Sequence, residues 1–150
     1  MKKAAFYFLV SFLIISCQKE PAACIEVEPS NTVTVFDEVT LKSCSEDAFW
    51  YEWEVEYFQN GAQLYQYSLE EETNYSWNQA GTFDVYLTVQ SENRKKQTSA
   101  NARVTATDVC YTCTNSASSE DICYSDYEDR SVFDAALANF VAAGFTCNKN

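Results

Sequence analysis

The sequence predicts an all-β protein: an antiparallel β-sandwich followed by a small cysteine-rich appendage that contains one helix. Three observations predict this fold. From about residue 24 to residue 107, apolar and polar residues alternate with the period of two that is typical of strands. Turn residues interrupt the alternation roughly every 8–12 residues, as in a sandwich. Beyond residue 107 the alternation ends, and four cysteines fall within 43 residues.

The N-terminal part of the alternating region predicts short strands with one apolar face. The segments CIEVE (24–28), TVTVF (32–36) and EVTLKSC (38–44) each alternate, and Pro29-Ser30-Asn31 separates the first from the second. Later strands are expected in AQLYQYS (62–68), TNYSW (73–77), TFDVYLTVQ (82–90) and QTSANARVTAT (97–107).

The segment AFWYEWEVEYF (48–58) shows the alternation most clearly. One face carries Tyr51, Trp53, Val55 and Tyr57, and the other carries Glu52, Glu54 and Glu56. A strand with one dry and one wet face belongs to an antiparallel sheet, because parallel sheets are usually covered on both faces. Asn60-Gly61 follows, and this dipeptide readily takes the positive φ of a hairpin turn.

These residues resemble the polycystic-kidney-disease (PKD) type of immunoglobulin-like domain. In that family a strand with an aromatic residue and a tryptophan precedes an aromatic-x-x-x-Gly-x-aromatic-x-Val-x-Leu-x-Val strand. In this chain YEWEVE is followed about twenty residues later by WNQAGTFDVYLTV. The positions matched are those of Trp53, Trp77, Gly81, Phe83, Val85, Leu87 and Val89.

The resemblance covers about residues 24–106 and implies an immunoglobulin-like sandwich, which we place at 24–107. One stretch departs from the family, which usually has Asp-Phe-Gly-Asp-Gly after the tryptophan. This chain has Glu54-Val55-Glu56-Tyr57-Phe58 there. We therefore expect a differently shaped hairpin and carry over no function of that loop.

The tail, residues 108–150, predicts one helix at about 132–143. Ser131 is the expected N-cap, with Asp134 at N3 in a capping-box pattern. The expected apolar stripe consists of Phe133, Leu137, Phe140 and Val141. Gly144 is expected to end the helix at C′. Because a single short helix is marginal alone, it must dock on the sandwich or on a small disulfide-tied hairpin.

The first residues predict a bacterial lipoprotein. Lys2-Lys3 precedes an uncharged apolar run, too short to span a bilayer, which indicates a signal peptide at 1–16. Ile14-Ile15-Ser16-Cys17 resembles the lipobox, which implies cleavage before Cys17 and acylation of that cysteine with fatty acids such as palmitate. Residues 17–23 are then the lipidated cysteine and its tether. We expect an outer-membrane protein of a Gram-negative bacterium.

The sequence leaves open which side of the membrane the protein faces. Gln18-Lys19-Glu20 looks like the short acidic-ended tag that sends some lipoproteins to the cell surface, but it is equally compatible with a solvated tether. Position 18 is not Asp, so the familiar inner-membrane retention residue is missing.

Six cysteines remain after Cys17, an even number. In an exported chain they are expected to form disulfides. Cys24 and Cys44 are expected to pair, because both end alternating segments. The other four, Cys110, Cys113, Cys123 and Cys147, then pair among themselves in an order that the sequence leaves open. Cys110 and Cys113 have CxxC spacing, so a thiol-disulfide oxidoreductase or a zinc site is an alternative.

Composition excludes several functions. Without the signal peptide the chain has 8 basic and 22 acidic side chains, a formal charge of −14, which opposes nucleic-acid binding. It has no histidine and only three glycines, so histidine-dependent catalysis and Gly-rich phosphate loops are excluded. The acidic runs lack the spacing of calcium loops and are expected to be solvated. We expect no enzyme activity, no cofactor and no metal.

The sequence therefore favours a recognition or spacer module that binds a protein or a carbohydrate. An alternative is a glycan-binding accessory lipoprotein of a polysaccharide-uptake system. The candidate residues for stacking on sugar rings are Trp50, Phe58, Tyr65 and Tyr67. A spacer would have a polar exposed face instead, and Trp50 and Phe58 could also pack under the tail.

Overall fold

The computed structural model describes residues 19–59 and 61–150. The predicted signal peptide, Cys17 and Asn60 lie outside the described residues. The elements in chain order are β1 (Ile25–Glu28), β2 (Thr32–Thr34), β3 (Val39–Ser43), β4 (Trp50–Gln59), β5 (Ala62–Ser68), β6 (Glu72–Tyr75), β7 (Gly81–Gln90), β8 (Gln97–Thr107), β9 (Cys110–Thr114), β10 (Ser119–Cys123), the 3-10 helix η1 (Tyr124–Asp126), α1 (Arg130–Ala142) and β11 (Thr146–Lys149).

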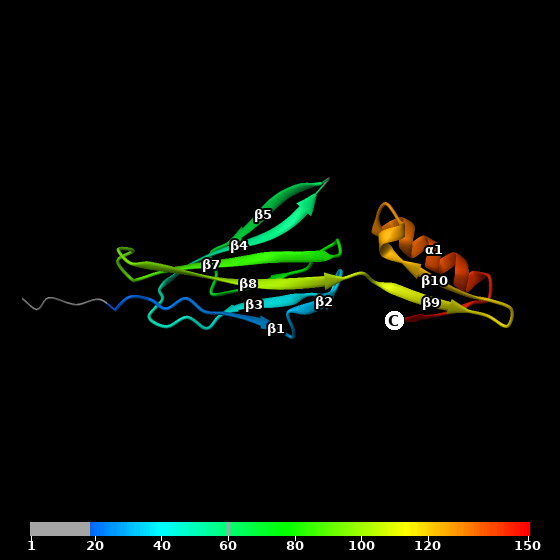
Figure 1. Cartoon of the computed structure of the whole chain (residues 1–150), viewed down its shortest axis with the longest axis horizontal. Helices are drawn as coiled ribbons and strands as arrows, with labels where there is room; N and C mark the ends of the chain where they lie inside the picture. The colour runs from blue at the N-terminus through cyan, green and yellow to red at the C-terminus, as the bar shows by residue number, and fades with distance from the viewer. Residues whose placement is uncertain (1–18, 60) are drawn as a thin grey trace, which may run out of the picture.

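The first eight strands form two sheets that pack face to face in one half of the molecule (Figure 1). The larger sheet has the strand order β2-β8-β7-β4-β5, and the smaller has β1-β3-β6. Neighbouring strands are antiparallel, except that β2 runs parallel to β8. The mainly antiparallel β architecture that the alternation predicts is thereby confirmed.

The core lies between the two sheets and contains residues that the alternation assigned to the inner faces. Trp53 of β4 and Leu87 of β7 are fully buried, and Leu41 of β3 faces them from the smaller sheet. The indole Nε1 of Trp53 donates a hydrogen bond of 2.9 Å to the carbonyl of Glu70. Each such side chain contributes about 1.5–3 kcal/mol when it leaves water, so this cluster is the main stabilising element.

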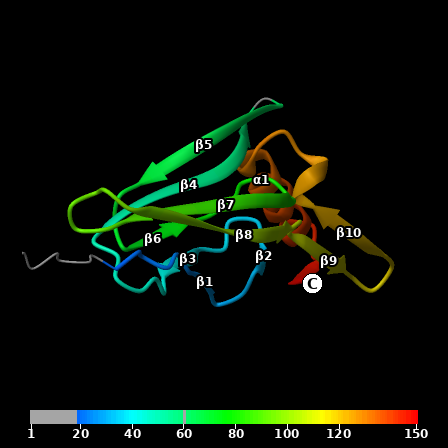
Figure 2. The same cartoon turned by 60° about the vertical axis from the view of Figure 1, so that its left-hand side comes forward.

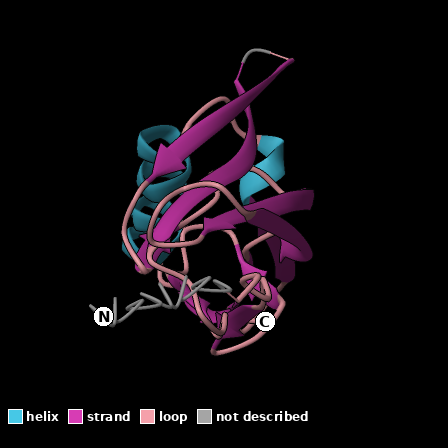
Figure 3. Ribbon diagram, turned by 90° about the vertical axis from the view of Figure 1, so that its left-hand side faces the viewer, coloured by secondary structure: helices cyan, strands magenta, loops and turns pink. Residues whose placement is uncertain are grey.

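Two glycines allow the turns on either side of the core. The β4–β5 hairpin is paired up to Gln59 and Ala62, and Gly61 in its turn has a φ of 77°, which favours glycine. Seen from the end of the molecule where residue 19 lies, this hairpin projects away from the rest (Figure 3). At the start of β7, a Cβ on Gly81 would lie 3.2 Å from Cζ of Phe83, so the close packing of that ring requires a glycine.

The chain backbone is hydrogen-bonded to the sandwich from residue 21 on, whereas the tether was expected to extend to residue 23. Pro21 is buried, and its carbonyl accepts a hydrogen bond of 2.7 Å from the hydroxyl of Thr98. The same hydroxyl accepts from the backbone N–H of Ala23 at 3.1 Å, and Ala22 forms a β-bridge with Glu46. These three residues, expected to belong to the tether, are therefore part of the folded body.

The tail forms a third sheet beside the sandwich, with the strand order β10-β9-β11 (Figure 2). The six cysteines form three disulfides, Cys24–Cys44, Cys110–Cys123 and Cys113–Cys147. In the tail each bonded pair lies directly opposite in neighbouring strands of this sheet. The two tail disulfides therefore tie both outer strands to β9.

The helix begins two residues earlier than predicted, because Asp129 and not Ser131 is its N-cap. A carboxylate oxygen of Asp129 accepts from the backbone N–H of Val132 at 3.0 Å, and the Ser131 hydroxyl donates to the same oxygen at 2.7 Å. An ionised acceptor also suits the positive end of the helix dipole. At the other end Gly144 has a φ of 87°, as expected for C′.

The apolar stripe of the helix is only partly covered. Phe133 is buried against the rings of Tyr111, Tyr124 and Tyr127, whose centroids lie 5.6–6.1 Å away. Val141 was expected to face the core, but it is 58% exposed, and the other two members of the stripe are half-buried.

The described residues contain no helix with the length and apolar character of a membrane span.

Side chains from both halves meet where the tail joins the sandwich. The rings of Phe36 and Tyr124 meet edge to face with centroids 4.8 Å apart. The guanidinium of Arg130 lies 4.3 Å above the centre of the Phe36 ring. Lys149 and Asp37 form an ion pair of 3.6 Å. The tail is thus held against one end of the sandwich.

The helix cap predicts a pH-dependent stability. The hydrogen bonds from Ser131 and from the Val132 backbone lower the pKa of Asp129 below its usual value. A lowered pKa in the folded state stabilises the fold above the pKa of the unfolded chain, and this contribution is lost as the pH falls through the lowered value. We expect Asp129→Ala to lower the thermal midpoint at neutral pH and to have little effect at a pH of about 2.

Thermal unfolding followed by circular dichroism checks this. The comparison variant Ser131→Ala keeps the carboxylate and should lower the midpoint less; an equal or larger effect would contradict Asp129 as the cap.

Candidate functional site

The outer face of the larger sheet carries a row of aromatic and polar side chains. The pairing register places Tyr67 of β5 opposite Glu54 of β4, Glu54 opposite Tyr86 of β7, and Tyr86 opposite Asn101 of β8. Cross-strand neighbours on one face have Cβ atoms about 4.5–5.5 Å apart. Glu54 therefore lies between two phenol rings. Tyr65 is two residues from Tyr67 on β5 and faces the same side.

These three tyrosines form what we call the tyrosine platform: Tyr65, Tyr67 and Tyr86. Tyr65, Tyr67 and Tyr86 are 37%, 60% and 36% exposed, whereas tyrosine residues in folded domains are on average partly buried. Exposed rings gathered on one face are unusual without a partner. A tyrosine ring also offers an apolar surface and a hydroxyl that donates and accepts hydrogen bonds.

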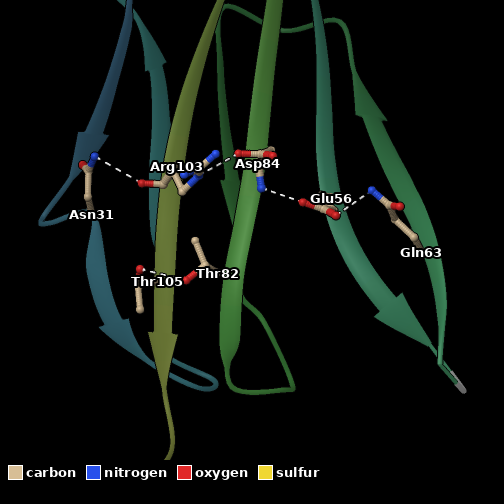
Figure 4. Close-up of polar contacts among 7 residues, drawn as sticks. All are labelled: Asn31, Glu56, Gln63, Thr82, Asp84, Arg103 and Thr105. Atoms are coloured by element: carbon tan, nitrogen blue, oxygen red, sulfur yellow. Dashed lines mark hydrogen bonds and ion pairs between the residues drawn. The ribbon is translucent and has the colours of Figure 1, made fainter.

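A hydrogen-bonded network in the next row supports the platform (Figure 4). The two carboxylate oxygens of Glu56 accept from the backbone N–H of Asp84 at 2.7 Å and from the amide of Gln63 at 2.6 Å. The Gln63 amide also donates to the hydroxyl of Tyr65 at 2.9 Å. On the other side, Arg103 and Asp84 form an ion pair of 3.0 Å. This network ties one platform ring to the central strands of the sheet.

The Glu56 carboxylate accepts from the Asp84 backbone because β4 separates from β7 after Val55. The β4–β7 pairing ends at Val55 and Val85, so the N–H of Asp84 has no strand carbonyl opposite it and bonds to the Glu56 side chain instead. The Glu56 carbonyl accepts from the indole Nε1 of Trp77 at 2.8 Å. The sequence placed Glu56 on a wet face with its neighbours; the structure corrects this, because only 7% of Glu56 is exposed.

Asp84 also sets the ionisation of two neighbours. Its negative charge, the largest cause, raises the pKa of the Tyr86 phenol. Its hydrogen bond and charge raise the pKa of Arg103. Both groups are protonated at neutral pH even at their ordinary pKa, so Asp84 widens the pH range over which the Tyr86 phenol remains a hydrogen-bond donor.

The structure separates the four residues predicted to stack on a ligand. Tyr65 and Tyr67 lie on the tyrosine platform. Trp50 is 46% exposed but lies at the end of β4, where Arg94 covers one face of the ring at 3.8 Å from its centre. Phe58 does not belong to this face: it is half-buried, with its ring 6.0 Å from that of Phe83.

Two concave regions accompany these side chains. A pocket of about 230 Å³ beside Trp50 is lined by Leu69, Thr88 and Arg94, among others. A more open cleft of about 570 Å³ lies between the sandwich and the tail, and Phe58 is in its wall.

Tyr86 was not among the residues predicted from the sequence, although the pattern contains the necessary information. Within TFDVYLTVQ, Phe83, Val85 and Leu87 were assigned to the inner face, and all three are buried. The aromatic residue at position 86 must then lie on the outer face of the same strand. A position like that of Tyr86 can thus be recognised as an aromatic residue that falls between the buried residues of a strand.

All four cysteines of the tail are bonded in disulfides. Cys110 and Cys113 are bonded to different partners and not to each other. In the described part of the chain, one group of potential metal ligands lies close together, Asp108 with Cys110 and Cys123. Its two sulfur atoms form a disulfide, so no thiolate is left to bind zinc.

No protein-family model matches the chain, and no curated protein matches it in sequence. The function of the protein must therefore be inferred from the geometry of the site.

The network predicts that Glu56 is important for stability. Glu56→Ala leaves the N–H of Asp84 without its acceptor, and we expect a loss of about 2 kcal/mol in the free energy of unfolding. Chemical denaturation measures it. Glu52→Ala, an exposed position on the same strand, is the matched control and should change the free energy by less than about 0.5 kcal/mol. Equal effects of the two variants would show that the buried carboxylate has no special role.

Proposed function

We propose that this chain is a non-catalytic lipoprotein of the cell envelope, anchored through Cys17, that binds carbohydrate on the outer face of an immunoglobulin-like sandwich. The observation that carries the proposal is the tyrosine platform: three exposed rings on one sheet face, two of which flank the carboxylate of Glu54. A spacer would have no need of exposed rings.

The order of the strands supports the immunoglobulin-like assignment. Immunoglobulin-like sandwiches pair strands C, F and G in one sheet and A, B and E in the other, and variable-type domains add C′ beside C. If β3 is strand B, the order β5-β4-β7-β8 matches C′-C-F-G and β1-β3-β6 matches A-B-E. Trp53 then occupies the core position on strand C. The PKD-type motif residues fit the same assignment.

The chemistry of the platform suits a neutral sugar chain. Phenol rings stack on the apolar faces of pyranose rings, and Glu54 and Asn101 in the same row can bond to sugar hydroxyls. The formal charge of −12 for the whole chain opposes polyanionic ligands. We infer a neutral polysaccharide, which suits an accessory lipoprotein of a polysaccharide-uptake system at the outer membrane.

The oxidoreductase alternative has little support. Exchange at a CxxC motif requires a disulfide between its own two cysteines, and here each is bonded to a different strand.

Ligand binding can be tested by affinity electrophoresis in gels that contain glucan, xylan, mannan or, as an acidic comparison, polygalacturonate. We expect retardation by a neutral polysaccharide. Tyr67→Ala and Tyr86→Ala should each weaken it about tenfold, because each removes a stacking ring. Tyr67→Phe, which keeps the ring, should have a smaller effect.

The control is Val141→Ala, which removes an exposed apolar side chain from the tail. If the platform variants migrate like the wild type in every gel that retards it, the platform is not the glycan site.

The anchor is tested in cells of a Gram-negative host grown with labelled palmitate. We expect label in the protein and recovery in the membrane fraction, and Cys17→Ser should abolish both. Protease added to intact cells, with lysed cells as the control, then determines the side of the membrane. Digestion of intact cells supports extracellular glycan as the ligand, whereas protection until lysis would contradict a surface location.

A further inference from the structure

One end of the sandwich combines exposed apolar side chains with basic residues. We call it the anchor end and define it by Phe49, Trp50, Leu69 and the β7–β8 turn at 91–96. The backbone N–H of Phe49 donates to the carbonyl of Gln90 at 3.0 Å, so the start of β4 lies beside this turn. Leu69 lines the same pocket as Trp50.

The apolar side chains of the anchor end are unusually exposed. Phe49 is 58%, Trp50 46% and Leu69 73% exposed. The other large hydrophobic residues of the described sandwich with comparable exposure are the three platform tyrosines. Trp53 and Trp77 are 0% and 2% exposed, so Trp50 is the one exposed tryptophan of the chain. Its indole N–H donates to the carbonyl of Glu92 at 3.2 Å, which fixes the ring at the surface.

Basic residues collect at the same end of an otherwise acidic chain. Lys19, Arg94, Lys95 and Lys96 are four of the eight Lys and Arg residues in the described part. Arg94 stacks on Trp50, and Lys19 pairs with Asp47 at 2.5 Å. The same end also carries acidic side chains, among them Glu46, Glu70 and Glu92, and the charge of Asp47 is neutralised by Lys19. Long basic side chains beside tryptophan are typical of protein surfaces at a membrane interface.

The N-terminal segment enters the fold at this end. Lys19 lies beside the loop at 46–47, and Pro21 is bonded to Thr98 next to the β7–β8 turn. Cys17 precedes Lys19 by two residues, so its Cα can lie at most about 7 Å from that of Lys19. A lipid attached to Cys17 would therefore hold the anchor end at the membrane surface.

We propose that the anchor end rests on a phospholipid surface, with Phe49, Trp50 and Leu69 in the interface and Arg94 and Lys95 at the headgroups. This inference depends on the lipidation of Cys17 that belongs to the proposed function. In this inference Trp50 contacts the membrane, whereas the tyrosine platform binds carbohydrate. A lipid chain and a small apolar patch together provide the two contacts that stable membrane attachment requires.

The fluorescence of Trp50 provides the test. The full lipidated protein is reconstituted into vesicles of phosphatidylethanolamine and phosphatidylglycerol, with or without bromine on the acyl chains. We expect brominated lipid to quench part of the emission, because Trp50 reaches the interface while the other two tryptophans are buried. Trp50→Phe should remove the quenched component.

A second variant tests the patch without removing the probe. Leu69→Asp should reduce the quenching about twofold by placing a charge in the interface. The matched control, Val141→Asp, changes an exposed apolar residue of the tail and should leave quenching unchanged.

Two negative results have different meanings. If the protein floats with the vesicles and Trp50 emits equally in both lipids, the inference is wrong and the anchoring proposal stands. If palmitate is absent and the protein does not float, the anchoring proposal fails first, and the inference falls with it.

Discussion

The carboxylate of Glu56 is the interaction on which the shape of the larger sheet depends. At this residue β4 stops pairing with β7 but continues to pair with β5. A side-chain oxygen takes the place of the missing strand carbonyl, so the N–H of Asp84 is satisfied although the strands separate. The hairpin can then project from the sheet without leaving a buried donor unpaired. The position of Tyr65, and with it the form of the exposed face, follows from this bond.

The alternation of apolar and polar residues, together with local turn and cap residues, predicts the regular parts of this fold. The inner faces of β4 and β7, the hairpin at Gly61 and the helix end at Gly144 were all predictable, because each depends on local residue spacing. The burial of Glu56 was not, because the pattern treats three successive glutamates as equivalent. Only the third lies where the strands separate. Phe58 changed environment for the same reason, since the alternation does not continue past the separation.

The helix and the tail show other limits of sequence reasoning. Ser131 and Asp129 are both good capping residues, and the choice between them depends on the backbone conformation before the helix. The four tail cysteines could pair in three ways because their partners are set by strand order. Once β9 lies between β10 and β11, both bonded pairs are opposite in register.

The Thr98 hydroxyl bonded to Pro21 has a mechanical consequence. Tension applied to the N-terminal segment reaches the sandwich near the start of β8, before it reaches β1. β8 is bonded to β7 through ten residue pairs. A pull along the long axis of the molecule loads those bonds together, in shear, and does not open them one after another. If the N-terminal segment is tethered, as proposed, a force on the far end of the domain would have to shear the β7–β8 ladder.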